Sequence, residues 1–307
     1  MQRKKLIALL ATFLFIGIAS AAIIPYFGRI ETTVNVTQAV LLDGKDYTTP
    51  IIREISGTGG QILYSCHTVE NLGDISATVK LSWEANDTEG INVEYFINTA
   101  TLVLENKDPT SWEIIEDSRK ATLTYNLVGS AFTYKIVAVG LEPNTEYSLI
   151  YYADFEPERF TYWGGNNPGA LIGTMTTDEH GYFSVSNTTD LNMDLPSAPD
   201  ANIDIYDYSG PPDYYNHAHG AKIWLVPSTD YDAEAKKLIA WNPTTYLFET
   251  DLIVYIDLDQ SLHLLHPDPP TTTEIVIPAH TTIEFVIRFK FAPNAYGTYV
   301  VTTTVSP

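Results

Sequence analysis

Two histidines in a stretch rich in tyrosine and aspartate are the clearest signal for metal chemistry. His217 and His219 are separated by one alanine. Residues two apart on a β-strand share a face, so both imidazoles would point at one Zn²⁺ ion there. Upstream carboxylates would supply oxygen ligands to zinc, or to Ca²⁺, and these are Asp204, Asp207 and Asp213. The competing interpretation is a solvated acidic loop that binds no metal.

Covalent catalysis has no recognisable carrier in this chain. Cys66 and His67 are neighbours, but adjacent side chains on a strand point to opposite faces and cannot pair. We expect Cys66 to be a small core residue on the face of Ile62 and Tyr64. The sequence contains no Gly-x-Ser-x-Gly elbow, no His-Glu-x-x-His motif and no glycine-rich phosphate loop. We therefore predict that the protein is not an enzyme.

A set of aromatic residues in turn-rich segments indicates a binding surface instead. These segments are marked by glycine, proline and asparagine, and they also carry aspartates. Such rings would stack against the face of a sugar, with amides and carboxylates binding its hydroxyls. The alternative is that the rings pack over the ends of a β-sandwich or serve a protein interface. The residues are Tyr162, Trp163, Tyr206, Tyr208, Tyr214 and Tyr215.

The elements that position these residues are almost all strands. In residues 282–292 large apolar side chains alternate with a polar face that includes Arg288, and residues 77–84 alternate in the same way. Turn signals such as Asp43-Gly44 separate such runs. Antiparallel strands at short spacing predict an all-β fold: a jelly-roll-like β-sandwich with a second, immunoglobulin-like β-sandwich inserted. The only helix we predict covers residues 231–238.

The first residues predict export. A basic start is followed by an apolar run and then by Ala19-Ser20-Ala21, which signal peptidases cut, so residues 1–22 are interpreted as a secretory signal. An uncleaved anchor is the alternative, because the apolar stretch continues to Ile24. We expect an extracellular or cell-surface location, where three sequons at Asn35, Asn86 and Asn187 would accept glycans.

The net charge of the chain limits the classes of partner that we expect. The chain has 17 Lys and Arg against 38 Asp and Glu, a formal net charge of −21. A nucleic acid or an anionic membrane surface requires a positive footprint, so neither is an expected partner. Membrane contact would come only from an uncleaved leader. One cysteine excludes an internal disulfide, so the fold depends on its core and hydrogen bonds.

Charge also divides the chain into parts. Residues 100–257 hold 24 Asp and Glu and 8 Lys and Arg, a net of −16, and the remainder holds 14 and 9, a net of −5. This compositional block predicts a domain, residues 100–257, inserted into an outer sandwich formed by residues 23–99 together with 258–307. Two sandwiches in series are the alternative organisation.

The outer part resembles the TasA and camelysin group of secreted fibre proteins and their archaeal bundling-pilus relatives. The similarity covers Val40-Leu41-Leu42-Asp43-Gly44, the Val69 to Asp74 turn before residues 77–81, Ile277-Pro278-Ala279 and Tyr296-Gly297-Thr298-Tyr299. It implies an exported sandwich that forms filaments or matrix. The large insert departs from the compact fibre subunit, and no motif carries the zinc protease activity associated with camelysin.

The middle part is similar to fibronectin type III and other immunoglobulin-like modules. The run from Leu141 to Tyr147 fits a tyrosine corner, in which the phenol bonds to nearby backbone. Residues 177–183 indicate a hairpin turn followed by a strand, and residues 220–227 a buried strand. This combination resembles modules of archaeal cell-surface proteins.

These observations lead to two functional hypotheses. The first is a non-enzymatic surface protein, a filament or matrix subunit, that joins copies of itself or other surface proteins by β-strand addition. The donor would be residues 23–42, with Val34, Val36, Val40 and Leu42 filling pockets on the neighbour; alternatively this strand pairs within its own sandwich. The second hypothesis is a monomeric module whose acidic, aromatic middle domain binds a glycan or a protein.

Overall fold

The computed structural model describes residues 39–153, 171–192, 195, 221–235, 237–259 and 269–306. Its regular structure is nearly all β, and the predicted all-β antiparallel class is confirmed. Within these residues the only parallel strand pair joins β18 (Ile256–Asp257) to β9 (Val128–Gly129). No helix in the described part of the chain is both long and apolar enough to cross a membrane.

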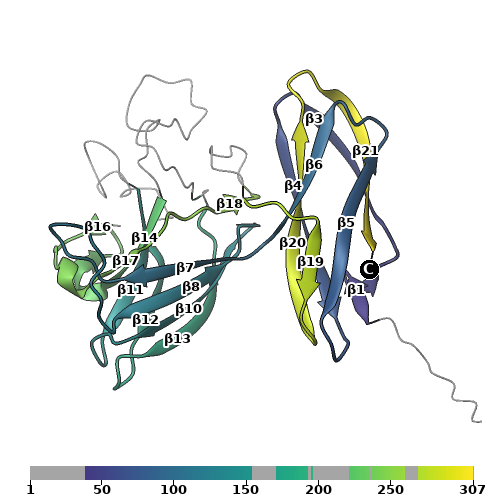
Figure 1. The fold of residues 1–307 in the computed structure, drawn as a ribbon. Helices are drawn as coiled ribbons and strands as arrows, with labels where there is room; N and C mark the ends of the chain where they lie inside the picture. Colours follow the sequence, from purple (N-terminus) through teal and green to yellow (C-terminus); the bar gives the residue numbers. More distant parts are fainter. Residues whose placement is uncertain are drawn as a thin grey trace, which may run out of the picture. The chain divides into compact units, whose positions relative to one another are not determined.

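Two sheets, which we call the outer sandwich, draw strands from both ends of the described chain (Figure 1). The five-stranded sheet has the order β2 (Lys45–Asp46), β1 (Val40–Leu42), β4 (Ile62–Asn71), β20 (Thr281–Phe291) and β6 (Ile91–Ile97). The four-stranded sheet has the order β19 (Glu274–Ile277), β5 (Ala77–Ala85), β21 (Tyr296–Ser306) and β3 (Ile51–Thr58).

The core of the outer sandwich follows from alternation along these strands. Phe285, Ile287 and Phe289 of β20 are buried against Val79 and Leu81 of β5, as the sequence pattern predicted. The opposite face of β20 departs from the expectation. Arg288, predicted to face solvent, is 1% exposed because Glu94 of β6 accepts its Nε–H at 2.8 Å and the ring of Phe96 lies 5.7 Å from its guanidinium.

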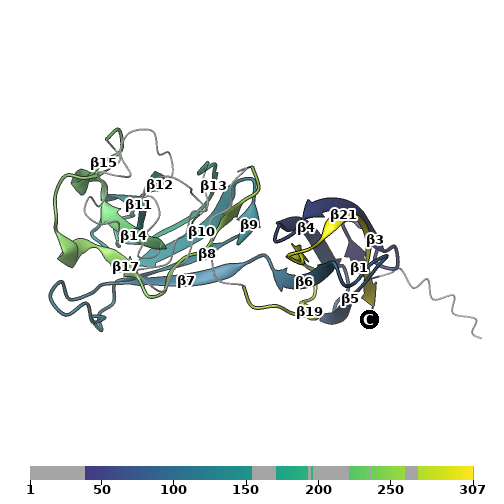
Figure 2. The same cartoon turned by 90° about the horizontal axis from the view of Figure 1, so that it is seen from above.

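The chain between these strands forms one eight-stranded antiparallel sheet, which we call the middle sheet (Figure 2). Its order is β12 (Leu171–Thr176), β11 (Glu146–Ala153), β14 (Ala221–Pro227), β17 (Leu247–Glu249), β7 (Ala100–Glu105), β8 (Lys120–Tyr125), β10 (Phe132–Val139) and β13 (Phe183–Thr189). The predicted strand near residues 220–227 is therefore present as β14, with Ile223 to Val226 buried.

The middle sheet curls so that its two edge strands meet. Thr189 Oγ1 of β13 donates a hydrogen bond to the carbonyl of Ile172 in β12 at 2.9 Å. A Cβ on Gly173 of β12 would lie 2.2 Å from the hydroxyl oxygen of Tyr134 in β10, so a larger residue there would require the Tyr134 ring to shift. A turn joins β12 to β13 as predicted, but the two strands pair with β11 and β10 rather than forming a hairpin.

Inside the curl lies a large apolar core that includes Phe132, Ile136 and Leu149. The tyrosine-corner hydrogen bond predicted from the sequence is present: Tyr147 is buried, and its hydroxyl accepts the N–H of Glu142 at 3.3 Å. Because this bond ties the start of β11 to the segment before it, it fixes the crossover between β10 and β11.

The prediction of a helix at residues 231–238 is wrong. The segment contains the strand pair β15 (Tyr231–Asp232) and β16 (Lys237–Leu238). The carboxylate of Asp232 accepts the N–H groups of Glu234 and Ala235, both within 2.9 Å, and so favours a turn over a helix. Two short 3₁₀ turns, η1 (Ser228–Asp230) and η2 (Pro243–Thr245), flank this region.

Candidate functional site

An incompletely paired strand marks the first candidate site. β4 has ten residues and pairs with β20 over nearly its whole length, but β1 covers only Val69–Asn71 on its other side. The chain leaves that side because Asp43 and Gly44 have positive φ values, 49° and 71°, and turn it into β2. No described strand lies beside Ile62–His67 there, so we call this stretch the open edge.

The backbone of the open edge points in a defined direction. The N–H of Thr68 bonds to the Asp43 carboxylate, and its carbonyl accepts the N–H of Asp43, each at 2.9 Å. Backbone groups two residues apart on a strand point the same way, so those of Cys66 and Ile62 also face the side that β1 leaves uncovered. Leu63 on this stretch is only partly buried against the outer core.

Three hydrogen-bonded polar side chains lie at the His67 end of the open edge. His67 Nδ1 lies 2.7 Å from Asp43 Oδ2, and its Nε2 lies 2.8 Å from the Ser65 hydroxyl. A carboxylate only accepts, so Nδ1 carries a proton and donates it to Asp43. Thr68 adds two hydrogen bonds to the same carboxylate. Burial would raise the pKa of Asp43, but the hydrogen bonds from Thr68 and His67 outweigh it and lower the pKa.

The order Asp43, His67, Ser65 matches the hydrogen-bond order of a Ser-His-Asp triad, but the burial is reversed. In such a triad the carboxylate is buried and the serine faces substrate. Here the Asp43 side chain is 42% exposed and the imidazole is 1% exposed, packed against the ring of Phe285. The three groups therefore serve as a strut that fixes the turn after β1 to β4.

A small cavity adjoins this strut. Its volume is about 220 Å³, and its lining includes Asp43 and His67 on one side and Ile51, Ile52 and Arg53 on the other. The last three residues begin β3, which is an edge of the four-stranded sheet. The open edge and the start of β3 thus border the same hollow at one side of the outer sandwich.

Two half-exposed tryptophans form the second candidate site. Trp112 is 49% exposed and Trp241 is 51% exposed, and their rings meet edge to face at a centroid distance of 6.5 Å. We call this pair the aromatic platform. Trp112 has φ 59°, a left-handed conformation that is strained for a bulky residue. Its N–H bonds to the carbonyl of Asp108 at 2.8 Å, which closes the loop that carries it.

Buried rings support the platform from below. Trp112 packs edge to face on Phe248 of β17 at 5.0 Å, and Trp241 contacts Trp224 of β14 at 5.9 Å and Tyr246 at 5.6 Å. The Tyr246 hydroxyl donates to Asp230 at 2.9 Å, and Asn242 donates to the same carboxylate oxygen at 3.0 Å. The exposed rings are therefore held by a cluster anchored to the middle sheet.

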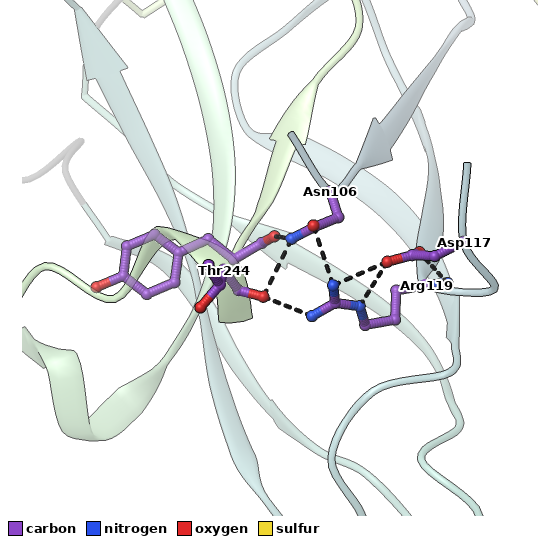
Figure 3. Close-up of polar contacts among 5 residues, drawn as sticks. Asn106, Asp117, Arg119 and Thr244 are labelled. Carbon is purple, nitrogen blue, oxygen red and sulfur yellow. Dashed lines mark hydrogen bonds and ion pairs between the residues drawn. The ribbon is translucent and has the colours of Figure 1, made fainter. Parts of the chain in front are cut away.

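A polar latch joins the two loops that carry the platform (Figure 3). Arg119 donates to the Thr244 carbonyl at 2.5 Å, to Asn106 Oδ1 at 3.0 Å and to Asp117 Oδ2 at 2.9 Å. Asn106 is fully buried and donates to the carbonyls of Thr244 and Tyr246. The planar guanidinium satisfies three acceptors at fixed angles, so the latch sets the position of each loop relative to the other.

One buried carboxyl group lies near the base of the Trp112 loop. Glu249 is 8% exposed, and Lys107 Nζ lies 3.9 Å from its Oε1. Burial raises the pKa of Glu249 to about 7, although the Lys107 charge acts in the opposite direction. Near neutral pH this side chain therefore exists in both protonation states.

The structure places some of the sequence-predicted residues and not others. Val40 and Leu42 are buried in β1 and pair with β4 of their own chain. Asn86 and Asn187 are exposed, the first just after β5 and the second in β13. The remaining predicted positions lie outside the described residues, and these are Val34, Asn35, Val36, Tyr162, Trp163, Tyr206, Tyr208, Tyr214, Tyr215, His217 and His219.

Cys66 lies on the face opposite His67, as predicted, but it is not in the core of its own sandwich. Its side chain is partly buried and packs against the middle core, with Sγ 3.9 Å from the Val128 carbonyl. Burial and the Glu284 charge raise its pKa to about 12, so the thiol stays protonated. Among the described residues no group of three or more His, Cys, Asp or Glu side chains could hold a metal ion.

Both candidate sites contain residues that the sequence interpretation missed. Trp112 follows Pro109-Thr110-Ser111 and Trp241 precedes Asn242-Pro243, so each tryptophan stands in a turn signal like those used for the tyrosines. Comparisons of the chain with protein-family models, with curated proteins and with solved structures found no match.

Proposed function

We propose that this chain is an exported cell-surface protein that joins copies of itself into a filament or matrix by β-strand addition at the open edge. The observation that carries the proposal is the pairing of β4, which β1 covers over only Val69–Asn71. A strand edge that no other described strand covers offers backbone donors and acceptors, such as those of Ile62 and Cys66, to an incoming strand, and flanking pockets select its side chains. The basic and apolar leader of residues 1–22 supports export.

The structure narrows the choice of donor. Val40 and Leu42 occupy their own sheet, so the donor reduces to the preceding residues, among which Val34 and Val36 alternate with polar residues. On the acceptor, Leu63 and Ser65 share the core-facing side of the open edge with His67, which lines the cavity of about 220 Å³. Head-to-tail joining gives a fibre when the rotation between successive copies does not close into a ring, and the proposal is the open, fibrous product.

Sedimentation velocity of the secreted chain, compared with a variant that lacks residues 23–37, tests the proposal. We expect large assemblies from the parent chain and monomers from the deletion variant. A synthetic peptide of residues 23–42 should then bind the deletion variant and slow amide exchange at Ile62 and Cys66, whose N–H groups face the uncovered side.

Two outcomes would contradict this function. An unchanged assembly state after the deletion would mean that residues 23–37 are not the donor strand. Protection of the amides of β3, with none at Ile62 and Cys66, moves strand addition to the other edge of the sandwich and away from the proposed one.

A further inference from the structure

We propose that the aromatic platform is a docking surface for a protein segment with an apolar centre and basic flanks. This inference is independent of strand addition, because the platform lies on loops of the middle sheet and the open edge lies on β4. Three observations carry it: the exposure of the rings, their fixed geometry and the charge of the loops around them.

The two loops that carry the platform hold five exposed large hydrophobic residues. Besides the two tryptophans, Ile114, Ile115 and Ile239 are 45%, 36% and 60% exposed. Isolated exposed hydrophobic residues are ordinary, but five on two short loops are characteristic of an interaction surface. Tryptophan is also the residue most enriched at the energetic centres of protein interfaces.

Geometry favours a protein segment over a flat polysaccharide. The two indole planes meet at 77°, whereas stacking along a flat sugar chain needs coplanar rings. The neighbouring polar groups are already used within the protein: Asn106, Asp117 and Arg119 in the latch, and Asn242 with Asp230. Aliphatic surface from Ile114, Ile115 and Ile239 lies on the same two loops.

The charge around the platform indicates that the flanks of the bound segment are basic. Glu113 and Glu116 are exposed on the Trp112 loop. The cations Lys107 and Arg119 of the first loop are engaged by Glu249 and Asp117. Residues 100–257 carry a net charge of −16. A partner with Lys or Arg beside its apolar centre matches this rim and would associate faster for it.

The platform is rigid before any partner arrives. The strained backbone of Trp112, the buried rings beneath and the Arg119 latch hold both indoles in one arrangement. A preformed surface loses little conformational entropy on binding, which is the condition under which a small patch gives useful affinity.

The test uses isothermal titration calorimetry of the full mature chain at physiological ionic strength. The probes are two synthetic peptides with the same Leu- and Trp-containing centre, one flanked by lysines and one by glutamates, together with neutral oligosaccharides of glucose and of N-acetylglucosamine. We expect the lysine-flanked peptide to bind, the glutamate-flanked peptide to bind at least roughly tenfold more weakly, and the sugars not to bind.

Variants separate docking from general charge attraction. The double variant Trp112→Ala with Trp241→Ala should weaken the lysine-flanked peptide roughly tenfold or more, whereas Tyr296→Ala, which removes an aromatic ring that is 89% exposed on β21, should leave it unchanged. Arg119→Lys keeps the charge but loses the fork geometry, so we expect an intermediate loss and greater quenching of the indoles by acrylamide.

Three results would overturn the proposal. Equal binding by the parent and the double variant would mean that acidity alone attracts the peptide. Binding of an oligosaccharide in place of the peptide would make the platform a sugar site. Absence of binding, with both indoles protected from acrylamide in the parent chain, would mean that the chain itself covers the platform, and absence of binding with accessible indoles would equally contradict docking.

Discussion

The outer sandwich and the middle sheet differ in how their strand edges are paired. In the outer sandwich β1 covers β4 over only Val69–Asn71, no other described strand pairs with that side, and the side chains of Asp43 and His67 lie beside it. In the middle sheet the edge strands β12 and β13 are brought together by the bond from Thr189 to Ile172. The feature that distinguishes the first region is thus the pairing of a strand edge, and in the second region it is the exposed side chains of Trp112 and Trp241 on loops.

The two regions also differ in the sign of their pH response. Asp43 in the outer sandwich has a lowered pKa, because hydrogen bonds to its carboxylate outweigh burial. Glu249 in the middle sheet has a pKa raised to about 7, because burial outweighs the Lys107 charge. Lowering the pH should therefore reduce the stability of the outer sandwich, and raising the pH should reduce the stability of the middle sheet. One chain thus contains a carboxyl group whose pKa is lowered on folding and another whose pKa is raised.

Core truncation is the strongest way to separate the two regions. Phe132 in the middle core and Phe285 in the outer core are both fully buried. Replacing either with alanine should cost about 3–5 kcal/mol. Hydrogen exchange should show that Phe132→Ala exposes mainly β7, β8 and β10, and that Phe285→Ala exposes mainly β4 and β20. A uniform increase in both variants would mean that the chain unfolds as one unit.

Removing the charge of Glu249 should isolate the alkaline response. Because its folded pKa lies above the unfolded value of 4.5, the folded chain keeps a proton between about pH 4.5 and about 7 that the unfolded chain has lost. Its free energy of unfolding therefore falls as pH rises through this window, by on the order of 3 kcal/mol. Urea unfolding at several pH values should give a flatter profile for Glu249→Gln. Parallel profiles for the two proteins would contradict this assignment.

Asp43→Asn should produce the smallest effect, limited to acid. The folded pKa of Asp43 lies below its usual value of 3.8, so its contribution is present above that value and is lost as pH falls through the folded pKa. The variant should lose stability near neutral pH and show a shallower acid limb in circular dichroism. Asp74→Asn is the matched control, since Asp74 is almost fully exposed beside His280. Equal effects at both positions would remove the special role of the strut.

Alternation in the sequence was enough to find β5 and β20, because each has one face in the outer core. It failed where polar groups are buried: Arg288 and His67 stand at polar positions of their strands and are buried with Glu94 and Asp43 as hydrogen-bond partners. It also failed at residues 231–238, where a turn stabilised by the Asp232 carboxylate replaced a helix.

The aromatic platform could not be predicted for a different reason. Each tryptophan stands in a recognisable turn, but their pairing depends on contacts between segments far apart in the chain. Arg119 and Thr244 are 125 residues apart, and Asn106 and Tyr246 are 140 apart. Local composition therefore indicated that exposed aromatic residues exist in the middle block without indicating which of them would meet.

The shortness of β1 has a mechanical consequence. Force applied along the chain from its N-terminal side reaches the outer sandwich at Val40, where only three residue pairs join β1 to β4. Such a strand peels away pair by pair, and the next resistance is the Asp43 carboxylate held by His67 and Thr68. The longer ladders of β20 and β21 lie deeper in the sheets. Under tension the pairs between β1 and β4 would therefore separate before the longer ladders of β20 and β21 open.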